Sequence, residues 1–169
     1  GSLSQFLVEI VRPDKEELDN ADNKFWQEDL PKRAIEALYE HTDKDFTLDE
    51  IIIDEAQDLL KPAYLEFLDH VLEGGLAAGK WRMFGDFSNQ VIQGDGNISL
   101  EDFLADRSGN ATLAYMKTNC RNTPRMVDTI QFYLGDYDYS GVRRPDNDLE
   151  CRLVFYSDNK DQELKLADI

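Results

Sequence analysis

The sequence predicts an α/β fold in which a parallel sheet is flanked by helices. Short β-branched apolar runs alternate along the chain with longer segments whose apolar residues recur at helical spacing. Strand–helix–strand connections of this kind place parallel strands side by side, and such sheets bind ligands beyond the carboxyl ends of their strands. At 169 residues the chain is long enough for one domain of ordinary size with a real core.

The first half of the chain predicts two strands, each preceded by a helix. Apolar residues at helical spacing predict a helix over 24–40, and the three isoleucines at 51–53 predict a strand that is buried on both faces. A second helix is expected over 62–72, because it starts with proline and is followed by two glycines. The next strand is expected over 81–85. Residues 1–12 fit either a strand or the end of a helix.

The second half predicts further alternation of helices and strands. Ser99 is expected to cap a short helix, and 112–117 is a candidate third strand. Thr123 and Pro124 are expected to open an amphipathic helix. A last strand over 152–156 and a helix over 162–169 complete the pattern.

The composition is strongly acidic. The chain has 18 Lys and Arg against 35 Asp and Glu, a net charge of −17, so we expect this chain alone to bind nucleic acid weakly. Most of these acids are expected on a solvated surface. The apolar runs are too short to cross a bilayer, no signal segment is seen, and the two cysteines lack metal-ligand spacing. A cytoplasmic protein without a membrane partner is therefore expected.

Asp54 and Glu55 follow the first predicted strand directly. One carboxylate at a strand end can hold the magnesium ion of a nucleotide, and its neighbour can accept a proton from an attacking water. Because such a pair also occurs as an ordinary charged strand terminus, the surrounding residues decide its meaning. The second motif of superfamily I helicases of the UvrD and Rep type closely resembles the string at 51–58, Ile-Ile-Ile-Asp-Glu-Ala-Gln-Asp. This resemblance implies that Asp54 binds magnesium, that Glu55 activates water, and that Gln57 and Asp58 link the nucleotide state to the site.

The second strand end resembles the third motif of the same family, Gly-Asp-x-x-Gln. Here it begins at Gly85 and Asp86 and reaches Gln90 with one residue more than the family pattern has. The resemblance implies that Asp86 lies at the nucleotide and that Gln90 senses the terminal phosphate, a task that suits a side-chain amide. The family continues with aromatic residues that stack on single-stranded bases, whereas 91–97 contains none.

A third motif, at 119–123, reads Asn-Cys-Arg-Asn-Thr and resembles the family's fourth motif, Asn-Tyr-Arg-Ser/Thr. The resemblance implies that Arg121 reaches the terminal phosphate and stabilises the charge that develops during transfer, which suits a permanently charged, forked donor. Cys120 stands where the family has a tyrosine that stacks on adenine. We expect Cys120 to be a small buried hydrophobe.

The resemblance covers about 24–134 and implies part of a RecA-like P-loop NTPase domain with three α/β/α layers. Residues 1–140 would be the C-terminal part of the first RecA-like domain and 141–150 a linker. Residues 151–169 would be either the start of a second RecA-like domain or a closing strand and helix. No Gly-x-x-x-x-Gly-Lys-Ser/Thr sequence occurs, so we expect the phosphate-binding loop to come from the remainder of a parent helicase.

Two functions follow as hypotheses. In the first, the parent is an ATP-dependent helicase or translocase that uses magnesium and binds single-stranded nucleic acid, and this chain alone is inactive. In the second, the parent is a helicase-like nucleotide switch or an interaction module that does not unwind. Three motifs at strand ends favour the first, and the net charge of −17 with the missing aromatic residues favours the second.

Overall fold

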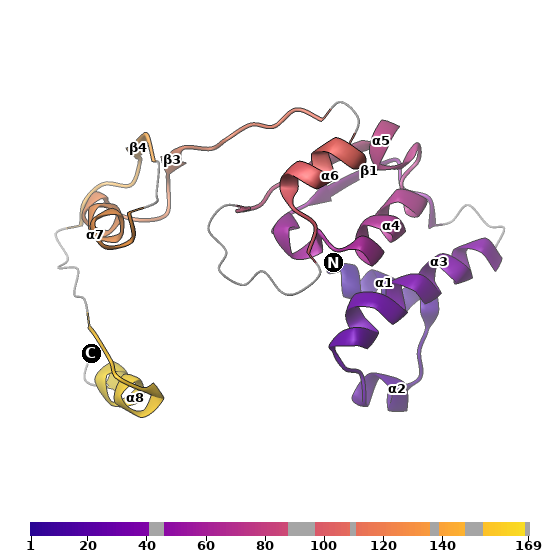
Figure 1. Ribbon diagram of the computed structural model, residues 1–169, viewed down its shortest axis with the longest axis horizontal. Coiled ribbons are helices and arrows are strands. Elements are labelled where there is room, and N and C mark those ends of the chain that lie inside the picture. Colours follow the sequence, from indigo (N-terminus) through magenta and orange to yellow (C-terminus); the bar gives the residue numbers. More distant parts are fainter. Residues whose placement is uncertain (41–45, 88–96, 109–110, 136–138, 148–153, 168–169) are drawn as a thin grey trace. The chain divides into compact units, whose positions relative to one another are not determined.

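The computed structural model describes the chain except residues 41–45, 88–96, 109–110, 136–138, 148–153 and 168–169. The chain divides into two compact units, Gly1–Thr112 and Leu113–Ile169. Strands and helices mix in both, and the described strands form two separate parallel pairs, so the α/β class is confirmed (Figure 1). The assignment of 1–140, 141–150 and 151–169 to RecA-like domains and a linker stays a prediction.

The first unit is mainly helical and contains one parallel pair of strands. In chain order its elements are α1 (Leu3–Val11), α2 (Lys15–Asp19), η1 (Phe25–Asp29), α3 (Leu30–Glu40), β1 (Glu50–Ile53), η3 (Ala56–Leu59), α4 (Pro62–Val71), α5 (Gly75–Ala78), β2 (Lys80–Met83) and α6 (Leu100–Asp106).

The N-terminal segment is a helix, which decides between the two alternatives that the sequence left open. Ser2 caps α1 through a reciprocal pair of hydrogen bonds, because its hydroxyl accepts from the Gln5 N–H and the Gln5 side chain accepts from the Ser2 N–H, both at 3.2 Å. The helix buries Leu7 and Ile10 against the core. Apolar spacing over these few residues was too short to separate a helix from a strand.

The helix expected over 24–40 is present, but its first part is a π-helical turn, η1, which continues into α3. The carbonyl oxygen of Trp26 in this turn accepts a hydrogen bond of 3.1 Å from the hydroxyl of Tyr64 in α4. Burial raises the pKa of the Tyr64 hydroxyl above its ordinary value. The wider turn therefore leaves a carbonyl available that fastens α4 to this segment.

Strands β1 and β2 pair in parallel, with Ile51 opposite Trp81 and Ile53 opposite Met83, and α4 and α5 connect them. Ile51 and Ile53 are buried, but Ile52 between them is 64% exposed. The expectation that this strand is buried on both faces is therefore wrong. The exposed face also carries the ion pair between Arg82 and Glu50, at 2.6 Å. Because the described strands form only separate pairs and one face of β1 is exposed, the described residues do not form the three-layer α/β/α arrangement that the resemblance implied.

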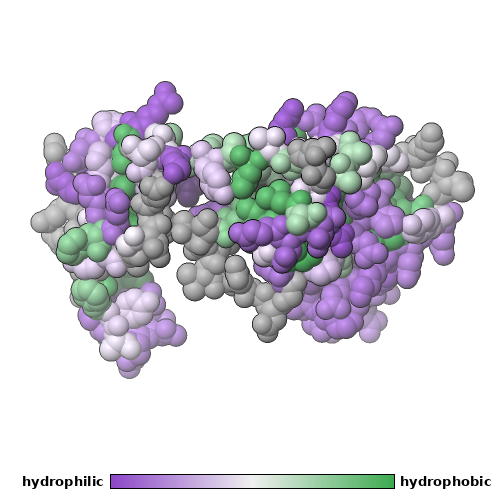
Figure 2. Space-filling model, turned by 45° about the horizontal axis from the view of Figure 1, so that its top comes forward, coloured by the Kyte–Doolittle hydropathy of each residue, from purple (hydrophilic) through white to green (hydrophobic). Residues whose placement is uncertain are grey.

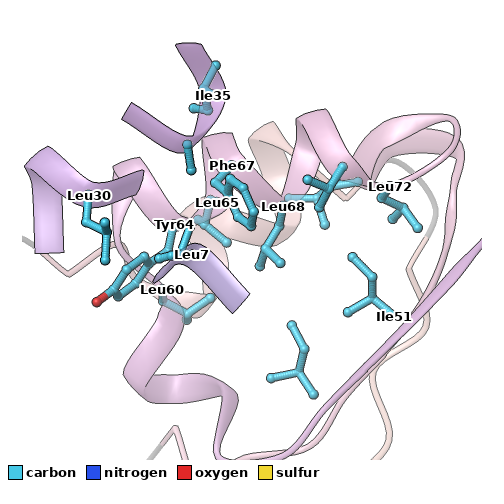
Figure 3. Packing of buried hydrophobic residues seen from close by; sticks show 14 of the residues in the cluster. Leu7, Leu30, Ile35, Ile51, Leu60, Tyr64, Leu65, Phe67, Leu68 and Leu72 are labelled. Carbon is cyan, nitrogen blue, oxygen red and sulfur yellow. The ribbon is translucent and has the colours of Figure 1, made fainter. Parts of the chain in front are cut away.

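The core of the first unit forms around α4. Figure 3 shows Leu65, Phe67 and Leu68 of this helix packed among side chains from α1, α3 and β1. The fully buried members include Leu65 and Phe67, and the Phe67 ring contacts the edge of Phe6 at 5.8 Å between centroids. Because α4 connects the two strands, this packing also fixes the parallel pair on which the candidate site is built.

The second unit contains β3 (Thr118–Asn119), α7 (Pro124–Leu134), β4 (Gly141–Val142) and α8 (Asn159–Ala167). The strands pair in parallel, with Thr118 opposite Gly141, and α7 connects them. The predicted helix after Thr123 is confirmed, with the Thr123 side chain accepting from the Met126 N–H at 3.4 Å.

Two strands were expected in the second half, and both predictions are wrong for the residues that the structure describes. Residues 112–117 form no strand, and the paired segment begins only at Thr118. Residues 154–156 form no strand either, and 152–153 lie outside the described residues. Both segments have β-forming composition, but composition does not provide the partner strand that a ladder needs. The final helix is present and begins at Asn159 rather than at 162.

The second unit leaves many apolar side chains exposed, and hydrophobic residues at the surface are visible in Figure 2. Within its described part Val127 is the buried apolar residue, whereas Met116 and Phe132 are more than 80% exposed. Helices of the described chain all fall short of the length and apolar character needed to cross a membrane.

Replacing Ile51 with alanine is expected to lower the free energy of unfolding by about 2–4 kcal/mol, because a buried branched side chain leaves a cavity. The same change at Ile52 is expected to cost less than about 1 kcal/mol, because that side chain is mostly exposed. Urea denaturation of both variants measures the difference. Equal losses would contradict the one-sided burial of β1.

Candidate functional site

The parallel pairing brings the acidic motif and the following Gly-Asp motif together at one edge of the β1–β2 pair. Backbone hydrogen bonds continue past the strands: the Phe84 N–H donates to the Ile53 carbonyl and the Ala56 N–H donates to the Phe84 carbonyl, both at 2.8 Å. The loop after β1 and the loop after β2 are therefore joined directly. This is the edge at which parallel sheets bind their ligands.

Gln57 is the buried polar side chain that joins the two loops. Its amide nitrogen donates to a carboxylate oxygen of Glu55 at 2.7 Å, and its carbonyl oxygen accepts from the Asp86 N–H at 3.1 Å. Only 8% of Gln57 is exposed, so these bonds compensate for the cost of burying its amide. The orientation of the Glu55 carboxylate thus depends on the position of the loop after β2.

Glu55 has a left-handed backbone conformation, with φ 54° and ψ 42°. A residue with a Cβ atom pays a steric penalty there, and such strain is concentrated at functional sites. The conformation is supported on both sides, because the Glu55 N–H donates to Asp54 Oδ1 at 3.0 Å and its carbonyl accepts from the Asp58 N–H at 3.1 Å. The turn presents the Glu55 side chain to solvent while Gln57 holds its carboxylate.

Gly85 lies so close to Gln57 that a side chain would not fit without movement. A Cβ atom at this position would be 2.5 Å from the Gln57 amide oxygen and 3.2 Å from the Ala56 backbone nitrogen. Real Cβ atoms are not found at the shorter distance. The absence of a side chain at Gly85 therefore allows the two loops to approach.

The three aspartates of the site differ in what they offer. Asp54 is exposed and uses one carboxylate oxygen for the Glu55 N–H, while Asp58 contributes its own N–H to the turn and exposes its side chain. Asp86 is exposed, and its backbone N–H donates to the Gln57 amide oxygen. Where the structure describes the chain, no three acidic, histidine or cysteine side chains come together to hold a metal ion.

Asp54 still fits a magnesium–nucleotide complex. Magnesium keeps several waters and is commonly bound by one or two carboxylates together with the phosphates of the substrate, so a dedicated cage of protein ligands is not required. The exposed Asp54 carboxylate, of which Oδ1 accepts the Glu55 N–H, can supply one such ligand. Gln90, the expected phosphate sensor, lies outside the described residues.

Arg121 belongs to the second unit and follows β3. The buried side chain of Asn119 accepts from the N–H groups of Arg121 at 3.0 Å and Asn122 at 2.9 Å, which fixes the turn in which Arg121 stands. The carbonyl of Arg121 accepts from Arg144 Nη1 at 2.7 Å. The Arg121 side chain itself is exposed and reaches solvent.

Cys120 is exposed, so the expectation of a small buried hydrophobe is wrong. The strand ends at Asn119, and it is the Asn119 side chain that is turned inward. Its neighbour Cys120 therefore faces the other way, as successive residues of an extended chain do.

Sequence reasoning missed the supporting roles of Gly85, Asn119 and Arg144. An asparagine at the end of a strand, followed by polar residues, is a recognisable signal for a side chain that caps the following turn. The close approach at Gly85 had no comparable signal, because it depends on where Gln57 lies in three dimensions.

No protein-family profile, curated protein or solved structure matches this chain.

Gly85→Ala is expected to lower the free energy of unfolding by about 1–3 kcal/mol, because the new methyl group displaces the Gln57 amide. In a Gln57→Ala background the same methyl group is expected to cost at least about 1 kcal/mol less, because the amide that it displaces is gone. Denaturation of the two single variants and the double variant measures this coupling. Strictly additive losses would contradict the packing inferred here.

Asn119→Ala is expected to speed hydrogen exchange of the Arg121 and Asn122 amides about fivefold or more, which corresponds to about 1 kcal/mol per lost hydrogen bond. Asn122→Ala keeps the Asn119 acceptor and serves as the matched control. Amide exchange followed by NMR distinguishes the two. Unchanged protection in Asn119→Ala would show that another group holds the turn.

Proposed function

We propose that this chain supplies the magnesium-binding, water-activating and phosphate-sensing groups of an ATP-dependent superfamily I helicase or translocase. The observation that carries the proposal is the Gln57 amide, which joins the Glu55 carboxylate to the loop after β2. The strained backbone of Glu55 lowers the stability of the fold. Such strain suits a carboxylate that must meet a substrate in one orientation, which here is fixed by the buried amide of Gln57.

Each residue of the edge has a role in this proposal. Asp54 holds magnesium, which neutralises phosphate charge when it is bound with the nucleotide. Glu55 accepts a proton from the attacking water, since its carboxylate is exposed and oriented by Gln57. Asp86 and Asp58 line the nucleotide. Because Gln57 is hydrogen-bonded to both Asp86 and Glu55, a shift of the loop at Asp86 on nucleotide binding would also move the Glu55 carboxylate.

Two further residues have roles in the parent enzyme that only the resemblance implies. Gln90 senses the terminal phosphate, and Arg121 stabilises the charge that develops on it. The phosphate-binding loop comes from the remainder of the parent, and the parallel pairs belong to RecA-like domains to which other strands contribute. The parent binds ATP, magnesium and single-stranded nucleic acid in the cytoplasm, whereas this chain alone does not turn over ATP.

A helicase-like nucleotide switch or interaction module is the second candidate. The observation that favours it is the exposed apolar surface of the second unit, where Met116, Phe132 and Phe155 are each more than 70% exposed. Large apolar side chains that stay exposed are available for contact with another protein. The net charge of −17 also opposes an extended grip on nucleic acid by this chain.

The decisive experiment measures ATP hydrolysis by the full-length parent with and without single-stranded DNA. Glu55→Gln is expected to reduce kcat at least about a hundredfold, because the change removes the proton acceptor but keeps the shape of the side chain. The matched control is Glu66→Gln, an exposed glutamate on α4 that is expected to leave turnover unchanged.

The result also separates the two candidate functions. Turnover that survives Glu55→Gln would refute the assignment of Glu55 as the base. A parent that binds ATP but does not hydrolyse it would favour the switch, and a parent that binds no nucleotide would favour the interaction module.

A further inference from the structure

The acidic charge of the chain is concentrated in the first unit. Residues Gly1–Thr112 have 10 basic and 25 acidic residues, a net charge of −15, whereas Leu113–Ile169 have 8 and 10, a net charge of −2. The acidic charge that opposes nucleic acid binding therefore lies mainly in the first unit, and the second unit is nearly neutral. A small group of cations in the second unit can dominate its local potential.

Arg143 and Arg144 stand directly after β4, where they adjoin the turn that contains Arg121. The Arg143 N–H donates to the Asn119 carbonyl at 2.9 Å, and Arg144 Nη1 donates to the Arg121 carbonyl at 2.7 Å. These two bonds hold the loop after β4 against the loop after β3. Three arginines consequently lie on adjoining loops at the carboxyl edge of this parallel pair.

The charges of Arg143 and Arg144 are not neutralised by acids in the described part of the chain. Their neighbour Arg125 pairs with Asp146 at 3.3 Å, but no described carboxylate comes within ion-pair distance of Arg143, Arg144 or Arg121. All three of these residues are exposed. Adjacent cations without counter-charges repel each other, and an anion bound between them relieves that repulsion.

We propose that Arg143 and Arg144 bind the phosphate backbone of a nucleic acid strand. The inference rests on the proposed function and deepens it, because it places the strand on the loop after β4 and leaves Arg121 for the nucleotide. Guanidinium groups suit phosphate oxygens, since they are planar, always charged and able to donate two parallel hydrogen bonds. Contacts to the backbone also hold a strand without the stacking aromatic residues that are missing at 91–97.

The test measures binding of a fluorescent oligo-deoxythymidine of about 20 nucleotides to the whole 169-residue chain by anisotropy, at roughly 50 mM salt and without ATP. Arg143→Gln/Arg144→Gln is expected to weaken binding about tenfold. Because two phosphate contacts are lost, the slope of log K against log salt is expected to become shallower by about 1.4.

Two further variants make the result specific. Lys15→Gln/Lys160→Gln removes the same charge from two exposed lysines elsewhere and is expected to change affinity by less than about twofold. Arg143→Lys/Arg144→Lys keeps both charges and is expected to restore the salt slope while recovering only part of the affinity, because an ammonium group cannot form the two parallel hydrogen bonds of a guanidinium. A restored slope would show that the loop has not simply unfolded.

Equal weakening by the two glutamine pairs, or no binding by the unaltered chain, would overturn the proposal. Displacement of the oligonucleotide by inorganic phosphate or ATP at equal phosphate concentration would assign the arginines to free phosphate instead. The binding assay involves no ATP hydrolysis. A failure to bind the oligonucleotide would therefore not decide whether Glu55 is the base, and a failed Glu55 experiment would not decide whether the arginines bind nucleic acid.

Discussion

The buried amide of Gln57 is the interaction on which the candidate site depends. It spans two loops that are 29 residues apart in sequence, and both ends of the amide form hydrogen bonds. A buried amide left without partners would destabilise the fold, so this group restricts the two loops to positions in which both bonds can form. The glycine at position 85 and the left-handed turn at Glu55 are the local features that allow both bonds to form.

The second unit uses a similar arrangement at a different strand end. There the buried side chain is Asn119, which accepts two backbone N–H groups and so holds the turn that exposes Arg121. In both units a buried side-chain amide at or just beyond the end of a parallel strand fixes a loop whose charged side chain is exposed. The arrangement separates the task of holding a loop from the task of meeting a ligand, because different residues perform them.

The sequence predicted the features that depend on local pattern. The helix from 24 to 40, the strand at the three isoleucines and the helix after Thr123 each have a strong periodic or capping signal, and each is present. The joining of the two loops that carry Asp54 and Asp86 agrees with the predicted parallel strands. Glu55 and Gln57 could be selected from their motif, but their mutual hydrogen bond could not, because it depends on the turn conformation.

The features that were predicted wrongly depend on partners distant in the sequence. Whether Ile52 is buried depends on what covers the second face of the sheet, and its own side chain carries no information about that. Residues 112–117 likewise have the composition of a strand, but no segment that the structure describes pairs with them. The π-helical turn at Phe25–Asp29 is accompanied by the tertiary hydrogen bond from Tyr64 to the Trp26 carbonyl, and the spacing of apolar residues indicates neither feature.

The two loops with functional candidates differ in what makes them rigid. The Glu55 turn stands on a strand whose neighbours pack against Leu65 and Phe67, so opening it requires disturbing a fully buried core. The Arg121 turn stands on a two-residue strand in a unit whose described part buries little apolar surface beyond Val127, so hydrogen bonds carry more of its order. Bonds near the surface open at lower free energy than a packed core does. The roles proposed for these residues agree with this difference, because a base that orients one water needs a fixed carboxylate, whereas a cation that follows a phosphate needs an adaptable turn.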